Sequence, residues 1–183
     1  MLTMQQFRTM YEKQQPKLLF FWGENPSKQS PVTKDCLSQW YPAGFEEDGV
    51  YYPTSEHYMM AKKALLFQDD ENYENILRAD HPKEAKALGR QVKNFDRATW
   101  DQHKTKIVTQ ANYLKFKQNE ELLDFLIATK EYALIEASPV DRIWGIGLGE
   151  EDPRIHEIDE WKGENLLGFS IMAAREQLLK EME

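Results

Sequence analysis

The chain has a single cysteine, no long apolar run and a deficit of basic residues. It carries 23 Lys and Arg against 31 Asp and Glu in 183 residues, a formal net charge of −8. Non-specific nucleic-acid binding requires a basic surface, so this class is disfavoured, although a local basic pocket for one phosphorylated ligand remains compatible with the charge. Cys36 has no second cysteine with which to form an internal disulfide or to share a metal site.

Segments that target or anchor a chain are also missing. No apolar stretch is long enough to span a bilayer, and the N-terminus lacks the apolar core of a signal peptide. We therefore expect a soluble, cytoplasmic protein that does not contact a membrane. The four histidines (His57, His81, His103 and His156) show no metal-ligand spacing, so the sequence predicts neither a metal nor another cofactor.

The length predicts one domain with, at most, a small appendage. Helical patterns dominate and the strand-like runs are few and short, so the expected fold class is mainly α, at the margin of α+β: a single multihelical domain. We divide the chain into an N-terminal helical extension, 1–16, and a domain, 17–183. Helices are predicted at 3–14, 54–67, 70–78, 80–89, 96–117, 120–129 and 165–181, buried strands at 17–22 and 132–137, a loop at 23–35, and a hairpin of 37–45 with 50–52.

The segment 136–149 combines a carboxylate, a guanidinium, an indole and three alternate glycines directly after a predicted strand. Pro139 and the glycines end regular structure there. A strand that ends in a loop of polar and aromatic groups is a common way to build a small-molecule site. An ordinary turn with a buried Trp144 accounts for the same pattern. The spacing of Gly145, Gly147 and Gly149 does not match a dinucleotide-binding fingerprint.

Helical spacing places Glu56, Met60 and Lys63 on one face, with Glu56 and Lys63 about 10 Å apart. The helix dipole stabilises a carboxylate in the first turn as the anion, which favours a nucleophile or cation stabiliser over a general acid. The alternative is that Glu56 only favours the helix start. Asp141 is a second candidate carboxylate, and two carboxylates can divide acid, base and stabilising roles.

Two tryptophans, Trp100 and Trp144, offer flat surfaces on which a base could stack, although Trp also commonly belongs to the core. Together with these residues, six ordered segments resemble the NADAR superfamily of YbiA-like proteins. The similarity covers about Phe20 to Arg175, and its ordered succession makes it specific. The segments are Thr54–Tyr58 with Lys63, Gly89–Phe95, Trp100, Ala111 with Lys115 and Phe116, Leu134–Gly147, and Gly163–Gly168 followed by Met172 and Arg175.

The resemblance implies N-glycosidase chemistry without a cofactor. Members of this family hydrolyse the C–N bond between ribose 5-phosphate and a base-like amine in early riboflavin intermediates, and others remove ADP-ribose from guanine in nucleic acid. The implied ligand is a ribosyl phosphate or an ADP-ribose-like molecule, and nucleic acid enters only as an ADP-ribosylated substrate. A non-catalytic module that binds ADP-ribose or NAD, and a helical interaction domain without a site, remain as alternatives.

The resemblance also implies roles for individual residues. Glu56 would bind ribose and stabilise the ribosyl cation or polarise water, and Asp141 would act as base or orienter. Lys63 would pair with Glu56 or form an imine with ring-opened ribose. The residues expected to contact substrate are Trp100 and Trp144 at the base, Arg90, Arg142 and Arg175 at phosphate, and the motif residues His57 and Asn165.

Overall fold

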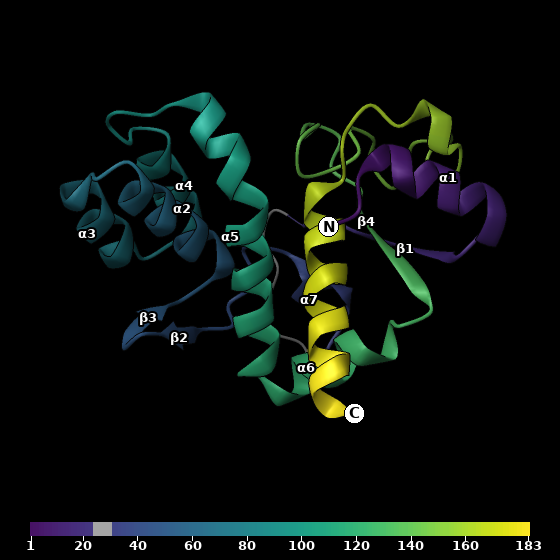
Figure 1. Cartoon of the computed structure of the whole chain (residues 1–183), viewed down its shortest axis with the longest axis horizontal. Helices are drawn as coiled ribbons and strands as arrows, with labels where there is room; N and C mark the ends of the chain where they lie inside the picture. The colour runs from purple at the N-terminus through teal and green to yellow at the C-terminus, as the bar shows by residue number, and fades with distance from the viewer. Residues whose placement is uncertain (24–30) are drawn as a thin grey trace.

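The computed structural model describes residues 1–23 and 31–183, and this part of the chain is mainly helical with a few short strands, as predicted (Figure 1). The helices are α1 (Met4–Gln14), α2 (Ser55–Leu66), α3 (Asp70–Arg78), α4 (Pro82–Gly89), α5 (Arg97–Lys117), α6 (Glu120–Ala128) and α7 (Leu166–Met182), and the strands are β1 (Lys17–Phe21), β2 (Phe45–Glu47), β3 (Val50–Tyr52) and β4 (Tyr132–Glu136). Short 3₁₀ turns occupy Lys34–Leu37 and Ile158–Glu160. The predicted loop 23–35 lies largely outside the described residues.

Helix α5 forms the centre of the molecule (Figure 1). Helices α2, α3 and α4 pack as a group on one side of it, and α7 lies alongside it on the other, next to β1 and β4. Among the described residues, no helix is long and apolar enough to cross a membrane.

The helix starts follow the capping residues that the sequence offers. The side chains of Thr54, Asp69 and Asp96 each accept a hydrogen bond from a backbone N–H three residues further on. Helix α4 begins with Pro82 in its first turn, after the cap residue His81. These local signals explain why the helices that surround the site begin where the sequence predicts.

Strands β1 and β4 form a two-stranded parallel sheet that is covered on both faces. Leu19 and Leu134 face the main core, whereas Phe20 and Ile135 face a second cluster. Two covered faces explain why both strands are continuous apolar runs. The expected burial does not hold throughout, because Trp22, directly after β1, is 40% exposed. Both strands end at the same edge of the sheet, where a site is commonly built.

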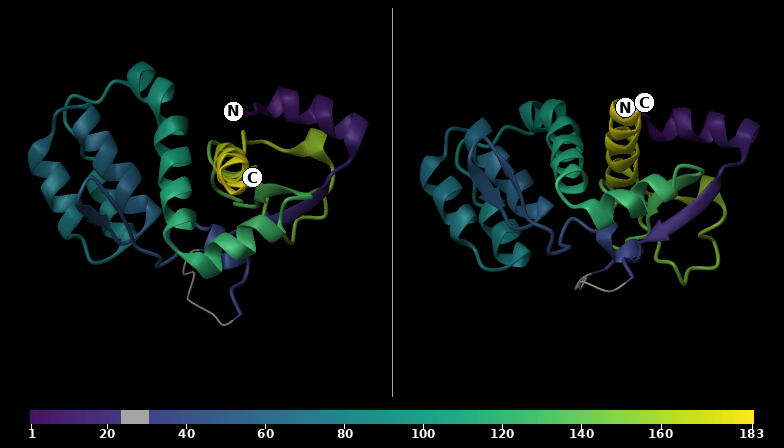
Figure 2. Two further views of the ribbon diagram at one scale, coloured as in Figure 1. Left: turned by 60° about the horizontal axis from the view of Figure 1, so that its bottom comes forward. Right: turned by 90° about the horizontal axis from the view of Figure 1, so that it is seen from below.

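Helix α1 packs firmly against the rest of the fold through Phe7, which is fully buried. The Phe7 ring stacks on Trp161 with a centroid separation of 5.9 Å and contacts Phe169 at 5.4 Å. Arg8 on the same helix donates to the carbonyls of Ile158 and Trp161. Figure 2 shows α1 and the segment 158–161 in two further views. The division of the chain at residue 16 stays an interpretation, but α1 contributes to a core.

The predicted hairpin is shorter than expected. Strands β2 and β3 pair in antiparallel register across Asp48 and Gly49, whose φ values of 52° and 80° fit the expected tight turn. Residues 37–44, however, form turns and no strand. At the start of this segment a buried amine takes the place of a strand partner: Lys115 Nζ donates to the carbonyls of Cys36 and Ser38 at 2.8 and 3.1 Å.

Candidate active site

A cavity of about 370 Å³ opens where β1 and β4 end, between α2, α4 and the start of α5. This volume is in the range of small-molecule sites. Its lining includes three carboxyl groups, three cations and four indoles. These are Glu56, Glu136 and Asp141; Lys63, Lys86 and Arg90; and Trp22, Trp40, Trp100 and Trp144. Because Glu56, Trp100 and Asp141 share one cavity, the alternative of an interaction domain without a site is wrong.

Glu56 lies in the first turn of α2 with only 3% of its surface exposed. Its backbone N–H donates to the carbonyl of Gln39 at 3.0 Å, and its Oε1 has no hydrogen-bond partner among the described residues. Burial raises the pKa of Glu56 to about 7, while Lys86 and a hydrogen bond from Trp40 oppose this rise. The helix dipole alone would keep Glu56 ionised at neutral pH. Burial raises its pKa by more than the dipole lowers it, so both protonation states are accessible near neutrality.

Glu136 is a cavity residue to which the sequence reasoning assigned no role. It ends β4, where its N–H donates to Asn165 Oδ1 at 2.9 Å and its carbonyl accepts from Ile146 N–H at 3.0 Å. Burial raises the pKa of Glu136 to about 8, with Asp141 and Glu56 adding to the rise and Lys86 opposing it. The signal that could have identified it is strand alternation, because Glu136 is in phase with the buried Leu134.

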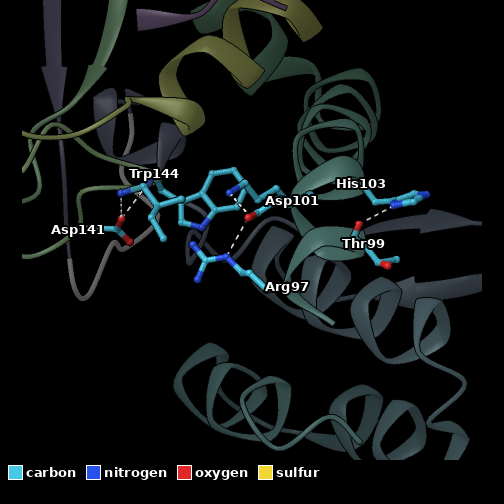
Figure 3. A network of polar contacts seen from close by, with 8 residues as sticks. Arg97, Thr99, Asp101, His103, Asp141 and Trp144 are labelled. Atoms are coloured by element: carbon cyan, nitrogen blue, oxygen red, sulfur yellow. Dashed lines mark hydrogen bonds and ion pairs between the residues drawn. The ribbon is translucent and has the colours of Figure 1, made fainter. Parts of the chain in front are cut away.

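Asp141 orders the loop that follows β4. Its Oδ1 accepts two backbone N–H bonds, from Ile143 and Trp144, both at 2.8 Å. Figure 3 shows these bonds and the Trp144 side chain on this loop, with Arg97 and Asp101 of α5 in the same view. One oxygen of Asp141 is therefore committed to the backbone as an acceptor, and this bonding fixes the part of the loop that carries Trp144.

Lys63 lines the cavity and makes its close contacts with residues other than Glu56. Its ammonium donates to the carbonyl of Gly89 at 2.7 Å and sits 4.4 Å from the ring centroid of Phe95 and 5.6 Å from that of Trp100. In the described part of the chain no ion pair joins it to Glu56, and its two alternative roles, pairing with Glu56 and imine formation, stay predictions. Burial lowers the pKa of Lys63, Arg90 lowers it further, and Glu56 opposes both.

Two predicted substrate contacts are instead satisfied inside the protein. His57 is fully buried; its Nε2 donates to the carbonyl of Ala79 at 3.0 Å, which leaves Nδ1 to accept from the Thr54 hydroxyl at 2.8 Å. Arg175 is 5% exposed, and its guanidinium donates to the carbonyls of Thr129 and Tyr132. The polar atoms of both side chains are used in hydrogen bonds that hold the fold, and substrate contact by either residue stays a prediction.

Asn165 and Arg142 also lie outside the cavity lining. Asn165 adopts a left-handed conformation (φ 52°) before α7, and its amide bridges Glu136 N–H and the carbonyl of Leu134. The stem of Arg142 packs beside Gly147, where an added Cβ would approach its Cγ to 3.0 Å. Both residues therefore support the loop and the end of β4 from outside the cavity, and substrate contact by either residue stays a prediction. Trp100, Trp144 and Arg90 do line the cavity.

Comparisons with known proteins identify similar chains of one family. The NADAR domain model matches residues 20–179. The chain is 42% identical over 166 residues to N-glycosidase R617 of Acanthamoeba polyphaga mimivirus, covering 88% of this chain and 96% of that protein. It is 36% identical over 134 residues to N-glycosidase YbiA of Escherichia coli, covering 73% and 75%. The NMR structure of E. coli YbiA superposes with a TM-score of 0.72 at 30% identity, over 91% and 88% of the two chains.

The match to the family model and to these relatives shows that the chain belongs to the NADAR family. Within that family it is an N-glycosidase, an enzyme that hydrolyses N-glycosyl bonds. The three carboxyl groups around one cavity suit this reaction class, because carboxyl pairs carry glycosyl hydrolysis in most known enzymes.

Proposed function

We propose that this N-glycosidase hydrolyses the bond between ribose 5-phosphate and a base-like amine, as in early intermediates of riboflavin biosynthesis. The observation that carries the proposal is the lining of one cavity, which combines three carboxyl groups, two cations at the C-terminal end of α4 and several indoles. Each group of residues matches one part of such a substrate.

The carboxyl groups match the ribose. Cleavage of a glycosidic C–N bond builds positive charge on the ribose ring, which a nearby carboxylate stabilises. Glu56, in its ionised form, contacts the ribose and stabilises this charge or polarises water. The second oxygen of Asp141 accepts no backbone bond from the residues that the structure describes, and it orients or deprotonates the attacking water.

The cations match the phosphate. Lys86 in α4 and Arg90, the residue that caps its C-terminus, lie four positions apart, a spacing that puts both on the same face of the helix. Among the described residues neither forms an ion pair, so both are available to an anion. A guanidinium fork binds phosphate oxygens in pairs, and a lysine adds a point charge. Lys86 was not among the residues predicted from the sequence.

Lys63 has a second route into the chemistry. Its lowered pKa increases the share of uncharged amine near neutrality. An uncharged amine adds to C1 of ring-opened ribose and forms an imine. This route remains part of the proposal as an alternative to a purely electrostatic role.

The aromatic residues match the base. Trp100 and Trp144 form walls on which a flat ring stacks. Three further apolar side chains lie exposed at the mouth, Trp22 at 40%, Ile143 at 36% and Val140 at 82%. This apolar mouth also favours a second candidate, an ADP-ribosylated guanine that extends beyond the cavity. The net charge of −8 weighs against a long nucleic-acid substrate. The second candidate substrate is therefore a short ADP-ribosylated oligonucleotide or nucleoside.

The test is a mass-spectrometric assay for released base. Early riboflavin intermediates, ADP-ribosyl-guanosine and NAD are offered in parallel to the wild type and to Glu56→Gln, which keeps the shape and removes the charge. We expect base release from the riboflavin intermediates and its loss in the variant. Release from ADP-ribosyl-guanosine alone would transfer the proposal to the second candidate, and saturable binding without release from any of the three would indicate a non-catalytic module.

A further inference from the structure

The position of Glu136 directs its carboxyl group into the cavity. Side chains alternate along β4, so that Ile135 and Ala137 face the second cluster whereas Leu134 faces the main core. Glu136 follows the phase of Leu134 and lines the cavity where the strand ends. The fold thus places an acidic residue at a position that otherwise takes core side chains.

The main chain around Glu136 is held rigidly. Asn165 and Ile146 bond its N–H and carbonyl, and the next residue, Ala137, donates to the carbonyl of Phe21 at 2.9 Å. Gly145 passes so close that an added Cβ would lie 2.9 Å from the Glu136 carbonyl oxygen. Its carboxyl group, in contrast, has a buried Oε2 without a hydrogen-bond partner among the described residues. A buried polar atom on a fixed backbone is normally satisfied, so this one is available to a ligand.

The surroundings favour protonation of Glu136 over protonation of Glu56. Glu56 receives a hydrogen bond from Trp40 and sits at the positive end of α2, and both features favour its ionised form. The charged groups that act on Glu136 are Asp141, Lys86 and Glu56, and two of these three are carboxyl groups. Neighbouring carboxyl groups resist simultaneous ionisation, so the proton resides on Glu136 while Glu56 is charged.

We propose that Glu136 is the general acid of this enzyme and donates its carboxyl proton to the leaving nitrogen. As the bond between C1 of the ribose and nitrogen breaks, its electron pair stays on nitrogen, which takes up the Glu136 proton. Water adds to C1 and loses one proton to Glu56 or Asp141. The base then releases this proton to solvent, and Glu136 takes up a proton from solvent. In total one water is consumed, and ribose with a free C1 hydroxyl and the free amine are produced. The inference rests on the proposed reaction at the ribosyl carbon but not on the identity of the base.

The decisive test compares leaving groups that differ in their need for a proton. The variant is Glu136→Gln, and the probes are an N-linked substrate of the wild type and a 4-nitrophenyl riboside 5-phosphate, whose nitrophenolate departs unprotonated. We expect kcat of the variant to fall by about 10²–10⁴-fold on the N-linked substrate and by less than about tenfold on the nitrophenyl probe. Glu56→Gln serves as the contrast, with loss on both probes, because both build charge on the ribose. Glu46→Gln is the control that leaves both rates unchanged, because Glu46 is exposed on β2 and lies outside the cavity lining.

A pH profile provides a second readout that does not depend on the variant's folding. In the wild type, kcat on the N-linked substrate should fall as pH rises above neutrality, because a general acid must be protonated. Glu136→Gln should remove this alkaline limb. If that variant fails to fold, Glu136→Asp is the substitute, because it retains a carboxyl group but moves it away from the leaving nitrogen. Glu136→Asp should lower kcat and keep the alkaline limb. Equal losses of Glu136→Gln on both probes, or a wild-type profile without an alkaline limb, would overturn the inference. Absence of base release from every substrate by the wild type would instead overturn the proposed function.

Discussion

Asn165 holds Glu136 through the main chain, with Asn165 Oδ1 accepting from Glu136 N–H at 2.9 Å and Asn165 Nδ2 donating to the Leu134 carbonyl at 3.0 Å. Asn165, the residue that precedes α7, thus fixes the main chain of the last residues of β4 by hydrogen bonds. The asparagine that the sequence pattern suggested as a substrate contact acts one step behind the cavity. Its effect on activity is expected to pass through Glu136.

Replacement of Asn165 should therefore lower stability and activity together. Asn165→Ala leaves two buried backbone groups without partners, and we expect a loss of roughly 1–3 kcal/mol in the free energy of unfolding and a lower kcat. Asn165→Gly, which tolerates the positive φ, should be less destabilised than Asn165→Ala, because alanine is strained there. Thermal unfolding and steady-state kinetics of both variants check this, and an unchanged kcat in both would contradict the positioning role.

Removal of the charge of Glu56 should abolish most turnover. Glu56→Gln is expected to lower kcat by at least about 10²-fold, because a neutral amide stabilises a ribosyl cation poorly. Asp141→Asn should also lose much of the rate, with an additional loosening of the Trp144 loop. Steady-state kinetics on the cleaved substrate measure both. A Glu56→Gln enzyme with near wild-type turnover would show that the assignment is wrong.

Trp100→Ala should act mainly on KM. If the indole stacks on the base, its loss is expected to raise KM by about tenfold or more, equivalent to about 1–3 kcal/mol of stacking, with a smaller change in kcat. The half-exposed Phe95 offers a matched comparison, since it lies beside Lys63 but not in the cavity lining. A reduced kcat with an unchanged KM in Trp100→Ala would favour a role in orienting Lys63.

Substitution of Lys86 or Arg90, the cations at the C-terminal end of α4, should raise KM more for phosphorylated than for dephosphorylated substrate. Lys86→Gln and Arg90→Gln are expected to raise KM for the ribosyl 5-phosphate substrate by about tenfold each, with little effect on the same substrate after phosphatase treatment. Lys83→Gln is the control, because Lys83 is exposed on the same helix outside the cavity. Equal effects on both substrate forms would remove the phosphate role from α4.

The buried carboxyl groups should make the protein less stable at alkaline pH. The pKa of Glu136 rises from an unfolded value of 4.5 to about 8, so the folded state binds the proton more tightly, and stability falls as pH increases from about 4.5 to about 8. Glu136→Gln cannot ionise. Its advantage over the wild type should grow from pH 5 to pH 8.5 by an amount on the order of 4 kcal/mol, or roughly 8–16 °C in Tm. Thermal unfolding at both pH values measures it, and Glu46→Gln should show no such change.

The helices could be predicted because their signals are local. Thr54, Asp69 and Asp96 cap helices within three residues, and Asp48 with Gly49 defines a turn by its own conformation. The turns at 37–44 could not be predicted in this way, since they depend on the amine of Lys115, far along the chain.

The site was predictable only in part for the same reason. Glu56, Lys63, Trp100, Asp141 and Trp144 meet at one cavity, as their motifs indicated. The sequence shows residue types and not their partners, so Arg175 resembled a phosphate ligand although Thr129 and Tyr132 occupy its guanidinium. The acidity of Glu136 depends on which elements surround the end of β4, and no local pattern specifies that.

The pairing of β1 with β4 sets a condition on how the enzyme acquires its activity. Phe21 aligns with Glu136 across most of the chain, and α7 must then close over the strand end through Asn165. Such non-local contacts form late, because the intervening loop must first be closed at an entropic cost. During synthesis on the ribosome, Glu56 and Lys63 emerge well before Glu136 and Asp141. A nascent chain that ends before Glu136 therefore lacks two of the three carboxyl groups of the cavity.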